Sequence, residues 1–264
     1  MRHHQVGATL VVVLIFLVAI TVIGTIAIRQ SMVGLSIATN SQVSQLVMQN
    51  SDAAFFNIEQ TNNIKESLTA QGMFGYINNA NDKNKELVFC FRGDQSQFFD
   101  IDRASLMQWE PGKAKPTSDA LGKDGYCDAD DTSSTSNWFT SGRRAVMTQV
   151  AVKFSTTGGE DDPFHDYQRD TDQKEGQIEE TKRVKIFAVS LMPNLTSVAR
   201  SNINICLQTH MSEVSIPDDT TPPTIPAGTL DINNPLRSVT ECLTSLNVPF
   251  TTQVSEYTLT QNFS

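Results

Sequence analysis

The chain has 264 residues and a formal net charge of −9. A surface with this excess of negative charge repels phosphate backbones, so we expect no direct nucleic-acid binding. Hydrophobic residues make up 39% of the sequence. They are concentrated at the N-terminus, and the remainder is rich in polar side chains. The length allows one large domain or two small ones.

The chain starts with the short leader MRHHQVG, followed by an uncharged apolar run at 8–28, ATLVVVLIFLVAITVIGTIAI. At about 1.5 Å per helical residue this run would be roughly 30 Å long, which matches the hydrocarbon core of a bilayer. Arg2 and the start amine favour a cytoplasmic N-terminus, with everything after Arg29 outside the inner membrane. A cleaved secretory signal is the alternative, but the run is long for a signal core and no convincing cleavage site follows it.

Behind the apolar run the helical pattern continues, and residues 29–71 are amphipathic. We therefore predict one helix from position 8 to about position 71, with Gly24 and Gly34 as sites of local unwinding or close helix contact. Gly72 and Gly75 are expected to end it. The apolar stripe that should contact a downstream sheet consists of Val43, Leu46, Val47, Ala54, Ile58, Ile64 and Leu68.

Alternating or continuous apolar segments downstream predict an antiparallel sheet. The expected strands are 86–91, 144–154, 183–192, 198–208 and roughly 253–261, with 183–192 and 198–208 forming a hairpin. Irregular structure is expected at 92–142, in the charged loop 155–181 and in the proline-rich loop 216–228. The predicted fold is α+β, with a long N-terminal helix packed on a sheet domain at 86–264.

Four cysteines are present, at Cys90, Cys127, Cys206 and Cys242. They form no CxxC or CxxxH pair, which argues against a zinc site and thioredoxin-like chemistry. An even number on the exported side of a membrane predicts disulfides, and three pairings are possible. We favour sequence neighbours, because each pair then closes a loop of about 35 residues rich in turn formers. Four free thiols in a reducing compartment are the alternative.

Several separated stretches of the first sixty residues follow a recognisable order. They are 5–17 (QVGATLVVVLIFL), Thr21 with Gly24, Arg29-Gln30-Ser31, Ala38-Thr39-Asn40 and 49–59 (QNSDAAFFNIE). In this order they resemble the N-terminus of type IV minor pilins, and within them the PilX type. The resemblance covers about a quarter of the chain, and the head carries no motif of its own.

The resemblance implies a type IV pilin-like fold and a defined maturation. Residues 1–7 would be a prepilin leader, cut by a prepilin peptidase after Gly7, and Ala8 would then be N-methylated. Glycine suits this position because the peptidase needs an extended, unobstructed backbone. An ordinary juxtamembrane glycine is the alternative. The 8–28 segment would anchor the chain in the inner membrane before assembly and form pilus core afterwards. Residues 29–264 would form the periplasmic, later extracellular, head.

One position departs from the family pattern. Most pilins carry Glu at the fifth mature residue, which here is Val12. That Glu is thought to pair with the N-terminal amine of a neighbouring subunit, and a buried carboxylate is useful only where such a partner exists. The resemblance therefore implies a subunit of a tip or priming complex. Its partners would be other minor pilins, the major pilin and a large tip adhesin.

No arrangement of catalytic or metal-binding residues is convincing, so we expect no enzymatic activity, no cofactor and no metal. His165 lies among Asp161, Asp162 and Asp166, but without a fixed ligand spacing. The stretch that begins at Asp128, Asp130 and Asp131 lacks the glycine and the final acid of an EF-hand loop. The tripeptide Arg92-Gly93-Asp94 has the sequence of an integrin-type adhesion motif, but such tripeptides occur by chance, and we favour a simple turn here.

Three other classes have the same layout. The first is a minor pseudopilin of type II secretion, similar to the GspK-like tip subunit, which genome neighbours would distinguish. The second is a periplasmic enzyme or binding module on a permanent anchor, which would keep its leader. The third is a pilus-borne adhesin, a class that overlaps with the minor pilins. Motility, DNA uptake and attachment are all compatible with the sequence.

Overall fold

The computed structural model describes residues 6–77, 82–92, 98–123, 125–131, 145–155 and 181–260. By its internal contacts the chain divides into two units, Met1–Gln45 and Leu46–Ser264. The first unit consists of the N-terminal part of helix α1. The second unit contains the end of α1 together with the head.

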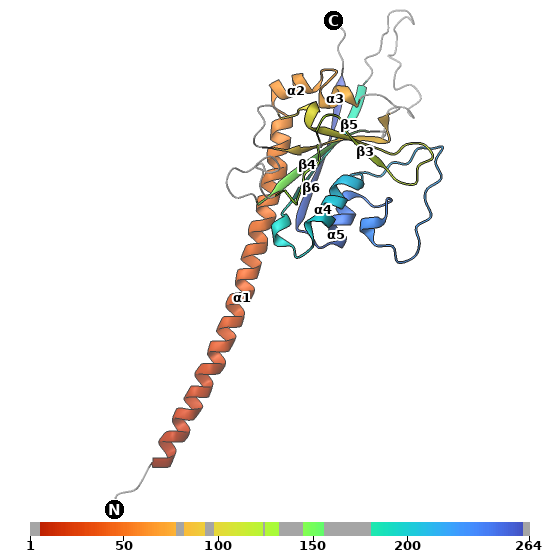
Figure 1. The fold of residues 1–264 in the computed structure, drawn as a ribbon. Coiled ribbons are helices and arrows are strands. Elements are labelled where there is room, and N and C mark those ends of the chain that lie inside the picture. Colours follow the sequence, from red (N-terminus) through yellow and green to blue (C-terminus); the bar gives the residue numbers. More distant parts are fainter. Residues whose placement is uncertain are drawn as a thin grey trace, which may run out of the picture. The chain divides into compact units, whose positions relative to one another are not determined.

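Helix α1 spans Val6–Ile58 without interruption (Figure 1). It is continuous through Gly24 and Gly34, so neither glycine is a site of unwinding. A single glycine costs a helix only about 1 kcal/mol relative to alanine. A Cβ at either glycine would meet no atom within 4 Å.

The predicted helix is too long at its C-terminal end. Instead of continuing to position 71, α1 stops at Ile58, and the short helices α2 (Thr61–Ser67) and α3 (Met73–Tyr76) follow. At the helix end the Asn57 carbonyl accepts hydrogen bonds from the Asn63 side chain at 2.7 Å and from the Gln60 N–H at 3.4 Å.

Gly72 and Gly75 have a different role from the expected helix stop. Gly72 precedes α3 and Gly75 lies within it. A Cβ at Gly72 would overlap the backbone of Glu66 and Ser67, and one at Gly75 would overlap the backbone of Thr69. The two glycines therefore allow α3 to approach the preceding backbone closely.

The head contains one six-stranded sheet in which every neighbouring pair is antiparallel, in the order β3-β2-β1-β4-β5-β6. Four of the predicted strands are confirmed, with shifted ends. The strands are β1 (Lys85–Phe91), β2 (Ala104–Gln108), β3 (Thr117–Ala120), β4 (Met147–Phe154), β5 (Thr181–Leu191) and β6 (Phe250–Thr260). Strands β2 and β3 lie in the stretch that was expected to be irregular.

The expected strand at 198–208 is wrong, and with it the hairpin. This stretch forms helix α4 (Arg200–Thr209), and β5 pairs instead with β4 and β6. The alternation around Asn202 and Asn204 suggested a strand. The helix instead buries Ile203, Cys206 and Leu207, whose spacing of three and four residues is helical.

The last turns of α1 pack on one face of the sheet. Ala54 and Ile58 are fully buried in a cluster with apolar side chains of β1, β4 and β5. The predicted stripe is confirmed only in its middle: Val47, Ala54 and Ile58 are buried, while Leu46, Ile64 and Leu68 are 39%, 36% and 45% exposed. The chain turn after Ile58 removes the later positions from the sheet.

Hydrogen bonds join the same turns to the sheet at three points. Ser51 donates to Ser190 at 2.8 Å, Gln253 donates to Asp52 at 2.6 Å, and the Tyr257 hydroxyl donates to Glu59 at 3.0 Å. Burial and the nearby Glu59 carboxylate raise the pKa of Tyr257 to about 12, so its hydroxyl remains a donor at neutral pH. These bonds fix the helix on β5 and β6.

The opposite face carries α4, α5 (Val239–Ser245) and both disulfides. Cys90 is bonded to Cys127, and Cys206 to Cys242, which is the pairing of sequence neighbours. Loops of this length are worth about 4 kcal/mol each in the chain-entropy account. Short 3₁₀ turns occur at Ile101–Arg103, Pro193–Leu195 and Asp231–Asn233. No helix or strand occurs at 216–228, as the prolines predicted.

Ile58 and Ile64 provide a matched test of the contact between helix and sheet. Ile58→Ala should lower the free energy of unfolding by about 2–5 kcal/mol, because it leaves a cavity in the core. Ile64→Ala, at a site that is 36% exposed, should cost below about 1 kcal/mol. Urea unfolding of the full chain in detergent, followed by tryptophan fluorescence, measures both. Equal losses would mean that α1 is not anchored through Ile58.

Candidate functional site

The N-terminal part of α1 exposes a long apolar surface. Its large hydrophobic side chains from Leu10 to Ile28 are between 50% and 69% exposed. An 18-residue window of the helix reaches a mean hydropathy of 3.1, and none of that window is buried. Each such side chain gains about 1.5–3 kcal/mol when it is fully removed from water. The segment is therefore consistent with membrane anchoring or with a signal sequence.

The apolar surface extends past the predicted membrane segment. After Arg29, the side chains of Met32, Val33, Leu35 and Ile37 are 59% to 67% exposed. Residues 29–45 thus carry exposed apolar side chains, and buried residues occur on the described part of α1 only from Val47 onward. Lipid or other helices would have to cover this surface.

The predicted maturation residues lie at the start of this helix. Gly7 and Ala8 are in the first turn of α1, which begins at Val6. Val12 is one turn further along, and its side chain is 50% exposed. No carboxylate from the described part of α1 replaces the missing Glu, because the first acidic residue of that helix is Asp52.

A buried polar network lies on the face of the sheet away from α1. Glu86 is completely buried on β1, and its carboxylate accepts the backbone N–H groups of Ser212 at 2.8 Å and Glu213 at 2.9 Å. Lys153 on β4 donates to the Glu213 carbonyl at 2.6 Å, and Lys185 on β5 pairs with the Glu213 carboxylate at 3.1 Å. The network fastens the segment after α4 across three strands.

Burial is the main cause of the pKa shifts of two members of this network, Glu86 and Lys153. It raises the pKa of Glu86 above the ordinary glutamate value, and the charge of Lys153 and the two backbone donors oppose this in part. Burial likewise lowers the pKa of Lys153, against the charges of Glu86 and Glu213. Sequence reasoning missed these residues. The available signal was a charged residue in each of two otherwise apolar strands, ELVFCF and VAVKF.

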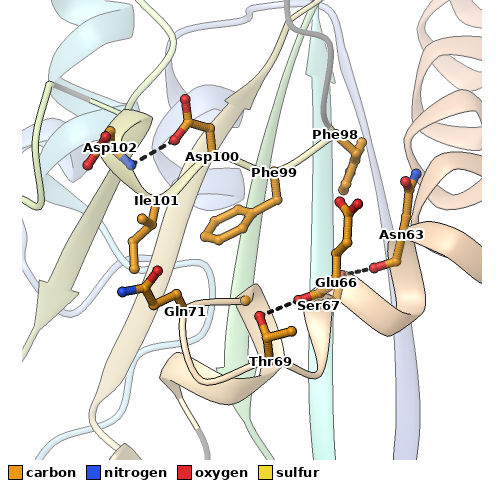
Figure 2. A pocket seen from close by; sticks show the side chains of 11 residues that line it. Asn63, Glu66, Ser67, Thr69, Gln71, Phe98, Phe99, Asp100, Ile101 and Asp102 are labelled. Atoms are coloured by element: carbon orange, nitrogen blue, oxygen red, sulfur yellow. Dashed lines mark hydrogen bonds between the residues drawn. The ribbon is translucent and has the colours of Figure 1, made fainter.

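A polar hollow of about 430 Å³ lies between α2 and the segment before β2 (Figure 2). One wall is α2 and the turn after it, and the other is residues 98–102. Glu66, Asp100 and Asp102 contribute carboxylates, and the Asp100 carboxylate accepts the N–H of Asp102 at 3.0 Å. Acceptors of this kind suit a cationic or hydroxyl-bearing group better than an anion.

The minor candidates from the sequence have no support in the described residues. Arg92 is only 9% exposed and donates to the Tyr126 carbonyl at 3.4 Å, so it is not presented as an adhesion motif. The Asn204 side chain donates to Asp128 at 2.6 Å and to Asp130 at 3.1 Å. Gly93, Asp94, His165 and its acidic neighbours lie outside the described residues. Within those residues no group of three or more His, Cys, Asp or Glu side chains could hold a metal ion.

Glu86 and Glu241 should have opposite effects on the pH dependence of stability. The folded state holds the Glu86 proton more tightly than the unfolded state, so stability falls as pH rises above about 4.5. The pKa of Glu241 is lowered, chiefly because the Ser238 N–H donates to it, so stability is gained as pH rises through its titration.

Glu86→Gln should therefore remove a downward slope of unfolding free energy against pH, and Glu241→Gln an upward one. Denaturation at a series of pH values measures both slopes. We also expect Glu86→Gln to cost about 1–3 kcal/mol at neutral pH, because a buried N–H group loses its acceptor. If both variants changed the slope in the same direction, the assignment of the buried carboxyl would be wrong.

Comparison of the chain with known protein families, with curated proteins and with solved structures finds no match. The architecture nevertheless supports a coarse classification of the fold. A long apolar N-terminal helix packs its C-terminal turns against an antiparallel sheet with two disulfides, an arrangement consistent with a pilin-like fold.

Proposed function

We propose that this protein is a structural minor pilin of a type IV pilus and belongs to the tip or priming complex that initiates pilus assembly. The observation that carries the proposal is helix α1. One uninterrupted helix exposes a long row of large apolar side chains in its N-terminal part and packs into the core of an antiparallel head with its last turns. Such a helix exposes too much apolar surface to remain in water, so it needs lipid or other apolar helices to cover it.

The same helix serves two states of the protein. Before assembly, the 8–28 segment holds the chain in the inner membrane with the N-terminus inside and the head in the periplasm. After extraction, the segment buries its apolar side chains against like helices of other minor pilins and of the major pilin. The exposed side chains at 32–37 extend this contact surface beyond the bilayer core. The assembled pilus would serve twitching motility, adhesion or DNA uptake.

Val12 supports a place at the tip. In a filament interior, a carboxylate at this position would neutralise the amine of a neighbouring subunit, whereas valine offers no charge. A subunit at the end of the filament has one neighbour fewer and lacks that requirement. The absence of another carboxylate before Asp52 in the described part of α1 agrees with this role.

Gly7 and Gly34 form a matched pair for testing maturation. Gly7→Leu should block removal of the leader, because a bulky side chain obstructs the backbone at the peptidase cut. Gly34→Leu places the same side chain on an open helix surface and should leave processing intact. Gel mobility of the exported chain separates the two forms. A mature-sized band from Gly7→Leu would contradict the proposal.

Position 12 tests the place in the filament. Immunogold labels on the native chain should be found at pilus ends. Val12→Glu restores the partner for a neighbouring amine, so its labels should also enter the shaft. Val12→Leu is the control and should remain at the ends. Native chains scattered evenly along the shaft would contradict the tip assignment while leaving the pilin assignment intact.

A further inference from the structure

Strand β6 forms one edge of the sheet and is paired on one side only. All eleven residues from Phe250 to Thr260 pair with β5, in unbroken register with Thr181–Leu191. Among the described residues, no backbone hydrogen bond reaches β6 from its other side. In such a strand, alternate residues direct their N–H and C=O groups outward, where another strand could form hydrogen bonds with them.

This edge lacks the usual protection. Edge strands of soluble proteins are commonly short, or carry lysine, proline or a bulge that blocks pairing with another chain. Strand β3, at the other edge, has four residues and includes Asp119. Strand β6 has eleven residues with no proline, glycine or lysine, and Glu256 is its one charged residue. On the face away from α1 it exposes Thr252, Val254, Glu256 and Thr258, with Val254 52% exposed.

The direction of the strands favours a neighbour that stands in the same orientation. Six strands alternate in direction, so β3 and β6 at the two edges run oppositely. A neighbouring head with this kind of sheet can therefore add its edge strand antiparallel to β6 without reversing its helix. Antiparallel pairing of β6 with a second β6 would instead place the helix segments Leu46–Ile58 of the two copies in opposite directions.

The side chains at the edge specify the chemistry of the added strand. Glu86, Lys153, Lys185 and Glu256 are register partners across β1, β4, β5 and β6, so this charged row ends in an acid at the free edge. A lysine or arginine directly opposite Glu256 would be stabilised by the opposite charge. The adjacent position on the same face would lie against Val254 and would favour a β-branched or aromatic side chain.

We propose that the free edge of β6 binds an extended strand of a partner protein, with a lysine or arginine opposite Glu256 and an apolar side chain opposite Val254. The identification of that partner as a neighbouring subunit rests on the proposed pilin function. The strand-binding property itself does not.

A peptide copy of β5 is the probe. The labelled nonapeptide KRVKIFAVS has the sequence of residues 182–190, which in the folded chain places Lys185 opposite Glu256 and Phe187 opposite Val254. Fluorescence anisotropy measures its binding to the full chain in detergent micelles. Val254→Lys should weaken binding about tenfold or more, because a lysine at the edge blocks strand addition. Ser118→Lys, an equivalent change on exposed β3, should leave binding unchanged and accounts for peptide held by the micelle.

A charge cycle tests the pairing itself. Replacing the lysine of the peptide that copies Lys185 with glutamine should weaken binding to the native chain roughly two- to fivefold. The same replacement should have no effect on the Glu256→Gln chain. Thermal melts of each variant establish that it is folded. Equal binding by the native, Val254→Lys and Ser118→Lys chains would overturn the proposal. Failure of leader removal would instead count against the pilin function alone.

Discussion

The structure depends on the burial of the last turns of α1 against the sheet. Ala54 and Ile58 are fully buried there. Ser51 donates a hydrogen bond to β5, and Asp52 and Glu59 accept hydrogen bonds from side chains of β6. Through this contact, a helix with a long exposed apolar surface is attached to a head that has its own buried core. In the described part of α1 the buried residues all lie from Val47 onward, whereas its apolar N-terminal half belongs to a separate unit of internal contacts.

The other face of the sheet is held by different means. There the disulfides Cys90–Cys127 and Cys206–Cys242 and the buried Glu86 attach long connections to the strands. Among the described residues, the unpaired backbone of the sheet lies at its two edges, β3 and β6. Strand β3 is short, so the long free edge of β6 is the part of the sheet best suited to contact a partner.

Sequence reasoning succeeded where the pattern is local. The apolar run, four strands and the disulfide pairing follow from hydrophobic periodicity and cysteine spacing. It failed where long-range contacts decide. Helix α4 alternates like a strand around Asn202 and Asn204, and only the position of its partner α5 shows that Ile203, Cys206 and Leu207 face inward together. The end of α1 at Ile58 has no glycine or proline to mark it. The maturation residues Gly7, Ala8 and Val12 come from resemblance, and they remain predictions.

The central claim is that one helix is first a membrane anchor and then part of a filament. Intact mass and N-terminal sequence of the protein, taken from native membranes and from sheared surface filaments, test it most directly. The account predicts a chain in both fractions that starts at Ala8, carries one methyl group on its amine and is four hydrogens lighter through its two disulfides. A chain that starts at Met1 and occurs only in membranes would contradict it and would indicate a permanently anchored protein.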